Sequence, residues 1–185
     1  MNAANVTTGK RRTAGGIYRA AVGTSLPTDA SSALAASFKE IGYISEDGVI
    51  NSIGKTVSEI KEWGGETVDF EVTEQTDAFK FKAIESMSID TLKAVFGDAN
   101  VSESSGALTV VVKAGAYGEG VWVIDVAQKG GRLKRIVIPN GKITELGDIV
   151  YNGSDAVGYD VTLSAFYNST IGGTHKEYIS AAPST

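Results

Sequence analysis

Two pairs of neighbouring carboxylates come closest to a reactive site in this sequence. Asp69 and Glu71 stand two residues apart in a strand-like run, so both would lie on one face, as an acid/base pair requires. Glu46 and Asp47 could open a cation-binding loop, but the regular ligand spacing of a calcium loop is absent and Asp47-Gly48 is a turn signal. The sequence shows no partner that would tune either pair, which favours solvated carboxylates.

Other reactive chemistry is largely excluded by composition. The chain of 185 residues has no Cys and one His, so a thiol nucleophile, a disulfide and a Cys/His zinc site are ruled out. His175 lies in a polar tail, where we expect a solvated surface imidazole. The glycine-rich run 115–120 lacks the Lys-Ser/Thr pair of a phosphate-binding loop and is interpreted as a flexible loop. We therefore predict no catalytic residue, no metal, no cofactor and no enzyme activity.

Charge is distributed unevenly along the chain. The net charge is −5, which argues against a surface that grips nucleic acid. The first 28 residues nevertheless carry no acid and four bases, which leaves −9 on the remainder; the bases are Lys10, Arg11, Arg12 and Arg19. No run approaches the roughly 20 apolar residues of a membrane span, so we predict no membrane insertion.

Turn signals divide the chain into short strands. Gly64-Gly65, Gly130-Gly131 and Asn140-Gly141 each separate two strand-like runs and supply the positive φ angles of two-residue hairpin turns. Asn152-Gly153 precedes a further run at 156–166 and predicts a fourth such turn. The sequence therefore predicts an antiparallel meander.

Alternation within the runs predicts which faces are buried. In residues 67–73, Val68, Phe70 and Val72 share one face and polar residues the other, and residues 157–165 alternate in the same way, with Asp160 on the polar face. Period two predicts a sheet with one buried and one solvent-exposed face. Residues 121–124 are apolar on both sides, which predicts a strand covered on both faces.

One helix interrupts the strands. Ser88 is a plausible N-cap and Gly97 a stop, and the stripe that packs against a sheet is Ile89, Leu92, Val95 and Phe96. We expect an all-β domain with this one helix over residues 16–175, a flexible basic arm over residues 1–15 and a C-terminal arm over residues 176–185.

Six segments in order along the chain carry a resemblance to a known family. They are residues 16–29 (GIYRAAVGTSLPTD), 38–48 (FKEIGYISEDG), 59–68 (EIKEWGGETV), 92–100 (LKAVFGDAN), 131–141 (GRLKRIVIPNG) and 156–163 (AVGYDVTL). Together they resemble the major tail tube proteins of long, non-contractile-tailed bacteriophages.

The resemblance implies a fold, an assembly and partners. The fold is mainly β, with two packed antiparallel sheets in a sandwich or barrel-like arrangement and one flanking helix. Hexameric rings of the protein would stack into a tube in the virion tail, assembled in the bacterial cytoplasm. The tape-measure protein would occupy the lumen, tail terminator and baseplate or tip proteins would bind the ends, and phage DNA would pass through without specific binding.

The same resemblance gives roles to the charged residues. A lumen that conducts DNA should repel phosphate, which makes Asp69, Glu71 and Asp160 candidates for its lining; an outer solvated face explains each equally well. The basic residues Lys10, Arg11, Arg12 and Arg19, and the loop 45–55 with Glu46 and Asp47, are candidates for contacts between rings. The alternative for the basic residues is a solvated tail.

Two other functions stay open. One is a tube protein of a related system, such as a gene transfer agent, a phage-tail-like bacteriocin or a type VI secretion system. The other is a receptor-binding or carbohydrate-binding tail protein, which would show clustered exposed aromatic residues. Trp63 and Trp122 fall on separate strands, so we interpret them as core or interface residues.

Overall fold

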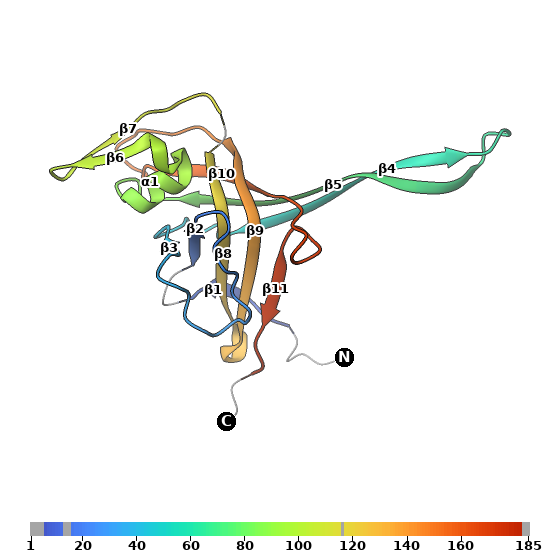
Figure 1. Ribbon diagram of the computed structural model, residues 1–185, viewed down its shortest axis with the longest axis horizontal. Coiled ribbons are helices and arrows are strands. Elements are labelled where there is room, and N and C mark those ends of the chain that lie inside the picture. Colours follow the sequence, from blue (N-terminus) through green and yellow to red (C-terminus); the bar gives the residue numbers. More distant parts are fainter. Residues whose placement is uncertain (1–5, 13–15, 116, 183–185) are drawn as a thin grey trace.

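The computed structural model describes residues 6–12, 16–115 and 117–182 (Figure 1). Within these ranges the chain forms a nine-stranded antiparallel sheet, a separate two-stranded sheet and one α-helix. The main sheet follows the order β3-β2-β8-β9-β10-β5-β4, and two further strands join its sides, β1 on β8 and β11 on β9. The small sheet pairs β6 with β7. The predicted fold, mainly antiparallel β with one flanking helix, is confirmed.

The elements have the following bounds. The early strands are β1 (Gly9–Arg11), β2 (Ile17–Ala20), β3 (Lys39–Glu40), β4 (Ile50–Lys61) and β5 (Thr67–Ala83), followed by the helix α1 (Ile89–Phe96). The later strands are β6 (Val101–Ser104), β7 (Ala107–Val110), β8 (Tyr117–Gln128), β9 (Leu133–Leu146), β10 (Tyr159–Ala165) and β11 (Lys176–Ile179). Short 3-10 turns cover Asp98–Asn100 and Lys129–Gly131.

The main core lies between two parts of the one large sheet. Figure 1 shows β8 and β9 running steeply across β5, so that the sheet turns a corner and faces itself. Across this space the ring of Phe81 on β5 lies 6.3 Å from the ring of Trp122 on β8. Both side chains belong to one buried apolar cluster, together with α1. The two packed layers are therefore parts of one continuous sheet.

The opposite face of β8 and β9 is buried as well. Val121, Val123 and Val137 form a second apolar cluster with Phe38, from the long segment that precedes β3. The prediction that residues 121–124 are covered on both faces is confirmed.

A buried ion pair holds this second layer in place. The guanidinium of Arg135 donates to both carboxylate oxygens of Asp125, at 2.7 and 2.8 Å, and both residues are almost fully buried. Its remaining nitrogen donates to the backbone carbonyls of Asp29 and Ser32. Arg135 thereby fastens the covering segment to the sheet.

The predicted helix is confirmed at both ends. The Ser88 hydroxyl accepts a hydrogen bond from the Thr91 backbone N–H, and the chain leaves the helix at Gly97 with φ 90°. Leu92, Val95 and Phe96 are buried. Ile89 is half-buried against the same core. In the described part of the chain, no helix is long and apolar enough to cross a membrane.

Hairpins form at two of the four predicted turns, although their loops, residues 62–66 and 129–132, are longer than the predicted two residues. Gly64-Gly65 joins β4 to β5, and Gly130-Gly131 joins β8 to β9. The turn predicted at Asn140-Gly141 is wrong, because these residues lie inside β9, which continues to Leu146. A Cβ at Gly141 would lie 2.6 Å from Trp122 Cδ1, so the glycine permits a close approach to that ring. The tight turn predicted at Asn152-Gly153 is also wrong, because these residues fall inside the long loop 147–158 between β9 and β10.

Both chain ends contribute strands to the main sheet. Residues 1–5, 13–15 and 183–185 of the predicted arms lie outside the described residues. Gly9–Arg11 pairs with β8, and Lys176–Ile179 pairs with β9. The flexibility of the ends stays a prediction. The interpretation of residues 115–120 as a flexible loop is wrong for residues 117–120, which begin β8.

Candidate functional site

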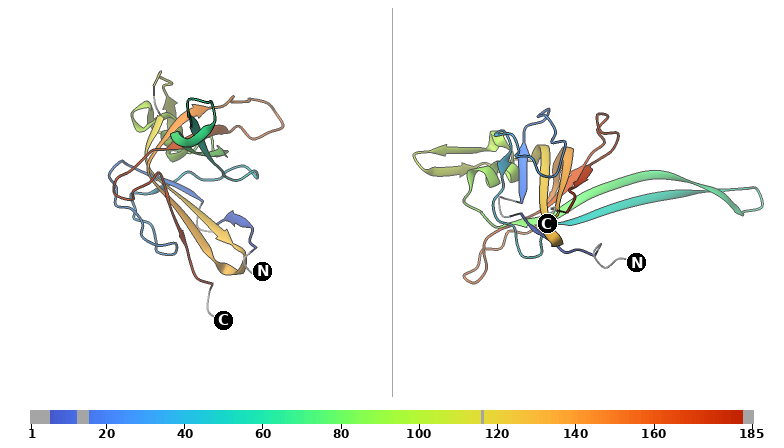
Figure 2. Two further views of the ribbon diagram at one scale, coloured as in Figure 1. Left: turned by 90° about the vertical axis from the view of Figure 1, so that its right-hand side faces the viewer. Right: turned by 90° about the horizontal axis from the view of Figure 1, so that it is seen from below.

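A long hairpin leaves the body of the molecule as a two-stranded ribbon (Figures 1 and 2). It consists of β4, the turn, and the outer part of β5, residues 50–76, and we call it the hairpin arm. Every residue in it is exposed except the half-buried Gly54. The twelve residues of β4 span about 40 Å at the usual rise per residue. Because an isolated two-stranded ribbon is marginally stable in water, its faces require a partner.

One face of the hairpin arm is apolar and uncovered. Val57 lies opposite Val72, so these side chains share a face, on which Phe70 and Val68 follow at alternate positions along β5. Glu59, opposite Phe70, interrupts this face and pairs with Lys61 at 3.5 Å. The four apolar side chains are between 47 and 64 % exposed. The prediction that residues 67–73 have a buried face is thus wrong within one chain, because no other described segment covers them. A contiguous exposed apolar surface of this kind marks an interaction site.

The opposite face of the hairpin arm is acidic. Asp69 lies opposite Ile60 and Glu71 opposite Ser58, so the structure brings these two predicted lumen residues together on one face. Asp160 lies apart from them on β10. It is directly opposite Lys82, so a basic residue is the cross-strand neighbour of this acid. The lumen assignment of all three residues stays a prediction.

The hairpin arm also holds most of the net charge of the chain. Residues 50–76 contain six acidic residues and two lysines, a net of −4 out of −5. The rest of the chain has 15 basic and 16 acidic residues, and is almost neutral. Of the −9 inferred for the chain after the first 28 residues, −4 lies in this one projecting element and −5 is spread over the rest of the body.

The tip of the hairpin arm presents a tryptophan. Trp63 is fully exposed, whereas Trp122 is fully buried in the core. Glu62 and Glu66 flank the turn, and backbone hydrogen bonds from Glu62 N to Glu66 O and from Gly65 N to Glu62 O close it. Of the two positions predicted as core or interface, Trp122 is core, and Trp63 is available to a partner.

A polar cluster anchors the root of the hairpin arm. The buried carboxylate of Asp77 accepts hydrogen bonds from Asn51 Nδ2 at 2.8 Å, Thr174 Oγ1 at 2.6 Å and His175 Nδ1 at 2.5 Å. Burial by itself would raise the pKa of Asp77, but the hydrogen bonds from Thr174, His175 and Asn51 outweigh it and hold that pKa below its ordinary value.

The prediction that His175 is a solvated surface residue, made from its polar sequence neighbours, is therefore wrong. Its side chain is 12 % exposed and its ring meets Phe79 edge-on at 5.3 Å. Sequence reasoning missed this cluster because Asp77 and His175 are 98 residues apart.

The basic residues predicted to contact other copies differ in their surroundings. Arg12 pairs with Asp125 at 3.3 Å and Arg19 with Asp98 at 2.8 Å, so both have partners in the same chain. Arg11 lies over the Tyr43 ring, 3.9 Å from a carboxylate oxygen of Glu40. Lys10 is exposed on β1.

The acidic pair in the predicted contact loop forms the expected turn. Gly48 N donates to Ser45 O, and the Ser45 hydroxyl donates to the Asp47 carboxylate at 3.2 Å. Glu46 is exposed at the same turn. Among the described residues no group of three or more His, Asp or Glu is placed to hold a metal ion.

Comparison with protein families places this geometry in a known group. A family model described as "Phage tail tube protein" matches residues 2–182. The chain belongs to the phage tail tube proteins. This confirms the resemblance read from the six segments, and gives the tail tube protein a structural role in the virion tail. A search of curated protein sequences found no match.

Proposed function

We propose that this tail tube protein assembles with five further copies into a hexameric ring, and that the rings stack into a tube through which the phage genome enters the host cell. The observation that carries the proposal is the hairpin arm, whose apolar face at Val57, Phe70 and Val72 is left uncovered by its own chain.

Open strand edges give further support. Beyond the stretch that β10 pairs, β5 has β4 on one side only, and no described strand pairs with the outer edge of β4. Exposed edges of this length invite pairing with another chain, and closure of a ring or a stack removes them. In a ring or a stack of identical copies, every open edge has a neighbouring copy that can pair with it.

The acidic face of the hairpin arm suits a conduit for DNA. Asp69 and Glu71 would be repeated in each copy around the ring, and a lumen lined by them would repel phosphate and let the genome pass. Asp160 is a further candidate for that lining. The tape-measure protein would occupy the same lumen during assembly in the host cytoplasm, and terminator and baseplate or tip proteins would bind the tube ends.

Electron microscopy of the purified protein tests the proposal. At rising protein concentration we expect rings with sixfold symmetry, and then tubes. Light scattering on the same samples gives the mass of the species in solution. A protein that remains monomeric at high concentration, alone and with tail assembly partners, would contradict the proposed function.

A further inference from the structure

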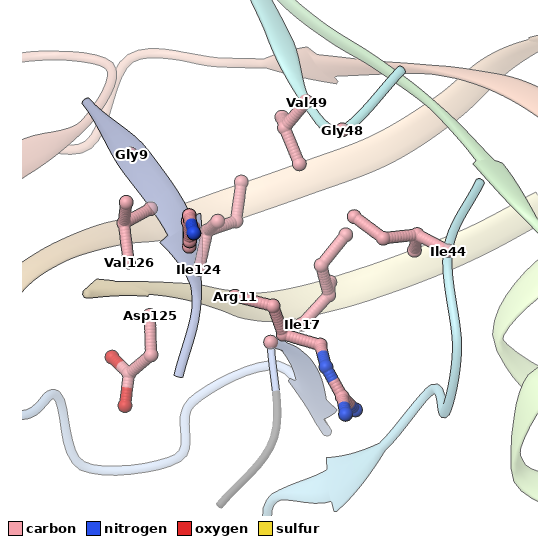
Figure 3. Close-up of a pocket in the computed structure, with 11 residues that line it drawn as sticks. Gly9, Arg11, Ile17, Ile44, Gly48, Val49, Ile124, Asp125 and Val126 are labelled. Atoms are coloured by element: carbon pink, nitrogen blue, oxygen red, sulfur yellow. The ribbon is translucent and has the colours of Figure 1, made fainter. Parts of the chain in front are cut away.

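An apolar pocket opens near the root of the hairpin arm (Figure 3). It lies between β1, β8 and the segment that leads into β4, and has a volume of about 160 Å³. Figure 3 shows Val49, Ile44 and Ile17 converging on it from different sides. Its aliphatic lining is completed by Ile124 and Val126. A cavity of about 150 Å³ accommodates a benzene ring, so this pocket has room for an aromatic side chain.

The rim of the pocket is positively charged. Lys10 and Arg11 border it from β1, and Arg11 also lies over the Tyr43 ring, 3.9 Å from a carboxylate oxygen of Glu40. The one acidic residue of the lining, Asp125, is engaged by Arg135 at 2.7 Å and by Arg12 at 3.3 Å, which offsets its charge. The pocket therefore offers an apolar floor and a cationic rim, a combination that suits an aromatic ring with acidic neighbours.

The tip of the hairpin arm has that chemistry. Trp63 is fully exposed at the turn, and Glu62 and Glu66 flank it. The arm behind the tip adds further negative charge, for a net of −4 over residues 50–76. Tryptophan is strongly enriched among the interface residues that contribute most of the binding energy.

The tip cannot fill the pocket of its own chain. Val49, in the lining, immediately precedes β4, whereas Trp63 follows the far end of that strand, about 40 Å away. The ribbon between them is continuously paired, so it does not fold back. Any tryptophan from this position that enters the pocket therefore belongs to another copy. Such a contact joins two different surfaces, and contacts of that type generate rings or open stacks.

We propose that Trp63 of one copy inserts into the apolar pocket beside β1 of a second copy, with Glu62 and Glu66 facing Lys10 and Arg11 on its rim. This inference rests on the proposed function, the assembly of identical copies, and specifies one contact between two copies. It gives Lys10 the main receiving role, with Arg11 contributing beside its own-chain contacts to Glu40 and Tyr43, and leaves Arg12 and Arg19 to their partners within the chain.

Substitutions at both sides of the contact test it. Trp63→Ala should raise the protein concentration needed for half-maximal assembly at least about tenfold. Tyr151→Ala, which removes another exposed aromatic ring from a loop of the body, is the matched control and should assemble normally. Val126→Phe should fill the pocket and reproduce the Trp63→Ala defect. Lys10→Glu and Glu62→Lys should each weaken assembly, and the two together should restore it.

The absence of Cys from the chain allows a direct geometric test. Two single-cysteine proteins, Lys10→Cys and Glu62→Cys, are mixed and oxidised, and the mixed disulfide is measured on a denaturing gel. We expect an efficient cross-link, which disappears when Trp63→Ala is added to the Glu62→Cys protein. The pair Glu62→Cys with Ser104→Cys, on β6, serves as control.

The two possible failures are distinguishable. Normal tubes from Trp63→Ala protein, with no Lys10–Glu62 cross-link, would overturn the docking contact and leave the tube function intact. Wild-type protein that never associates would overturn the tube function itself.

Discussion

His175 Nδ1 donates a hydrogen bond to Asp77 Oδ2, and this contact ties the segment before β11 to the first buried residue of β5. The imidazole is the donor because an ionised carboxylate has no hydrogen to give and can only accept. Thr174 donates to the same oxygen and Asn51, on β4, to the other. Asp77 thus holds both strands of the hairpin arm and the C-terminal segment at one point.

Loss of the Asp77 charge should destabilise the protein. Asp77→Asn should lower the free energy of unfolding at pH 7 by about 1–3 kcal/mol, because the amide cannot accept at both of its side-chain atoms. Urea unfolding measures this. Glu74→Gln, at an exposed carboxylate of the same strand, is the control and should change stability little.

The same cluster should make stability depend on acid pH. The pKa of Asp77 in the folded protein lies below the ordinary aspartate value of 3.8, so the stability that its charge contributes is present above about pH 4 and is lost as pH falls through the folded-state pKa. Unfolding free energies measured from pH 6 downward should therefore fall more steeply for the wild type than for Asp77→Asn. Parallel curves for the two proteins would contradict this assignment.

The apolar face of the hairpin arm should matter for assembly and hardly at all for folding. Phe70→Ser with Val72→Ser alters side chains that are 64 and 47 % exposed in the single chain, so thermal unfolding of the monomer should shift little. Assembly, followed by light scattering, should fall sharply. Val150→Ser, at a position 56 % exposed in a body loop, should leave assembly unchanged. Equal assembly of the double variant and the control would show that this face stays solvent-exposed in the tube.

Reversal of charge at the candidate lumen residues should impair DNA delivery. Phage particles that carry Asp69→Lys with Glu71→Lys should contain tails of normal length, because both side chains are exposed. Genome release should be slowed by attraction between lysine and phosphate. Counting plaques and measuring ejected DNA check this. Glu103→Lys with Asp148→Lys makes the same change of charge elsewhere, and normal infectivity of both variants would remove Asp69 and Glu71 from the lumen.

Truncation of the buried guanidinium should unfold the region around β8. Arg135→Ala leaves the Asp125 carboxylate almost buried with only the longer contact to Arg12, and should cost about 3–5 kcal/mol of unfolding free energy. Arg135→Lys should recover only part of it, since a single ammonium cannot bind both carboxylate oxygens and two carbonyls in the plane of a guanidinium. Urea unfolding of the three proteins decides this, and full recovery by lysine would show that charge alone is needed.

Local signals in the sequence predicted the elements whose causes are local. The Ser88 cap, the helical stripe and Gly97 lie within ten residues, and the turn between β4 and β5 uses the positive φ of Gly65. Asn140-Gly141 carries the same local signal, but the glycine is needed because the Trp122 ring lies against it. That contact is set by packing between strands, which outweighs the turn preference.

The candidate site depends on contacts between residues far apart in the sequence and between separate molecules, which a single sequence does not reveal. Alternation at Val68, Phe70 and Val72 shows that a face needs cover, and it does not show that the cover must come from another molecule. The Asp77–His175 contact joins positions that only the folded sheet brings together. Trp63 had the same signal as Trp122, and their opposite surroundings follow from the projection of β4 and β5 beyond the body.

The length of β4 has a consequence for the dimensions of the assembly. If the tip of each hairpin arm seats in the pocket at the root of the next, the pockets of two joined copies are separated by the extent of twelve extended residues, about 40 Å. The number of residues in this one strand then sets the spacing between neighbouring copies in the assembly. Insertion of two residues into each strand would lengthen that spacing by about 7 Å.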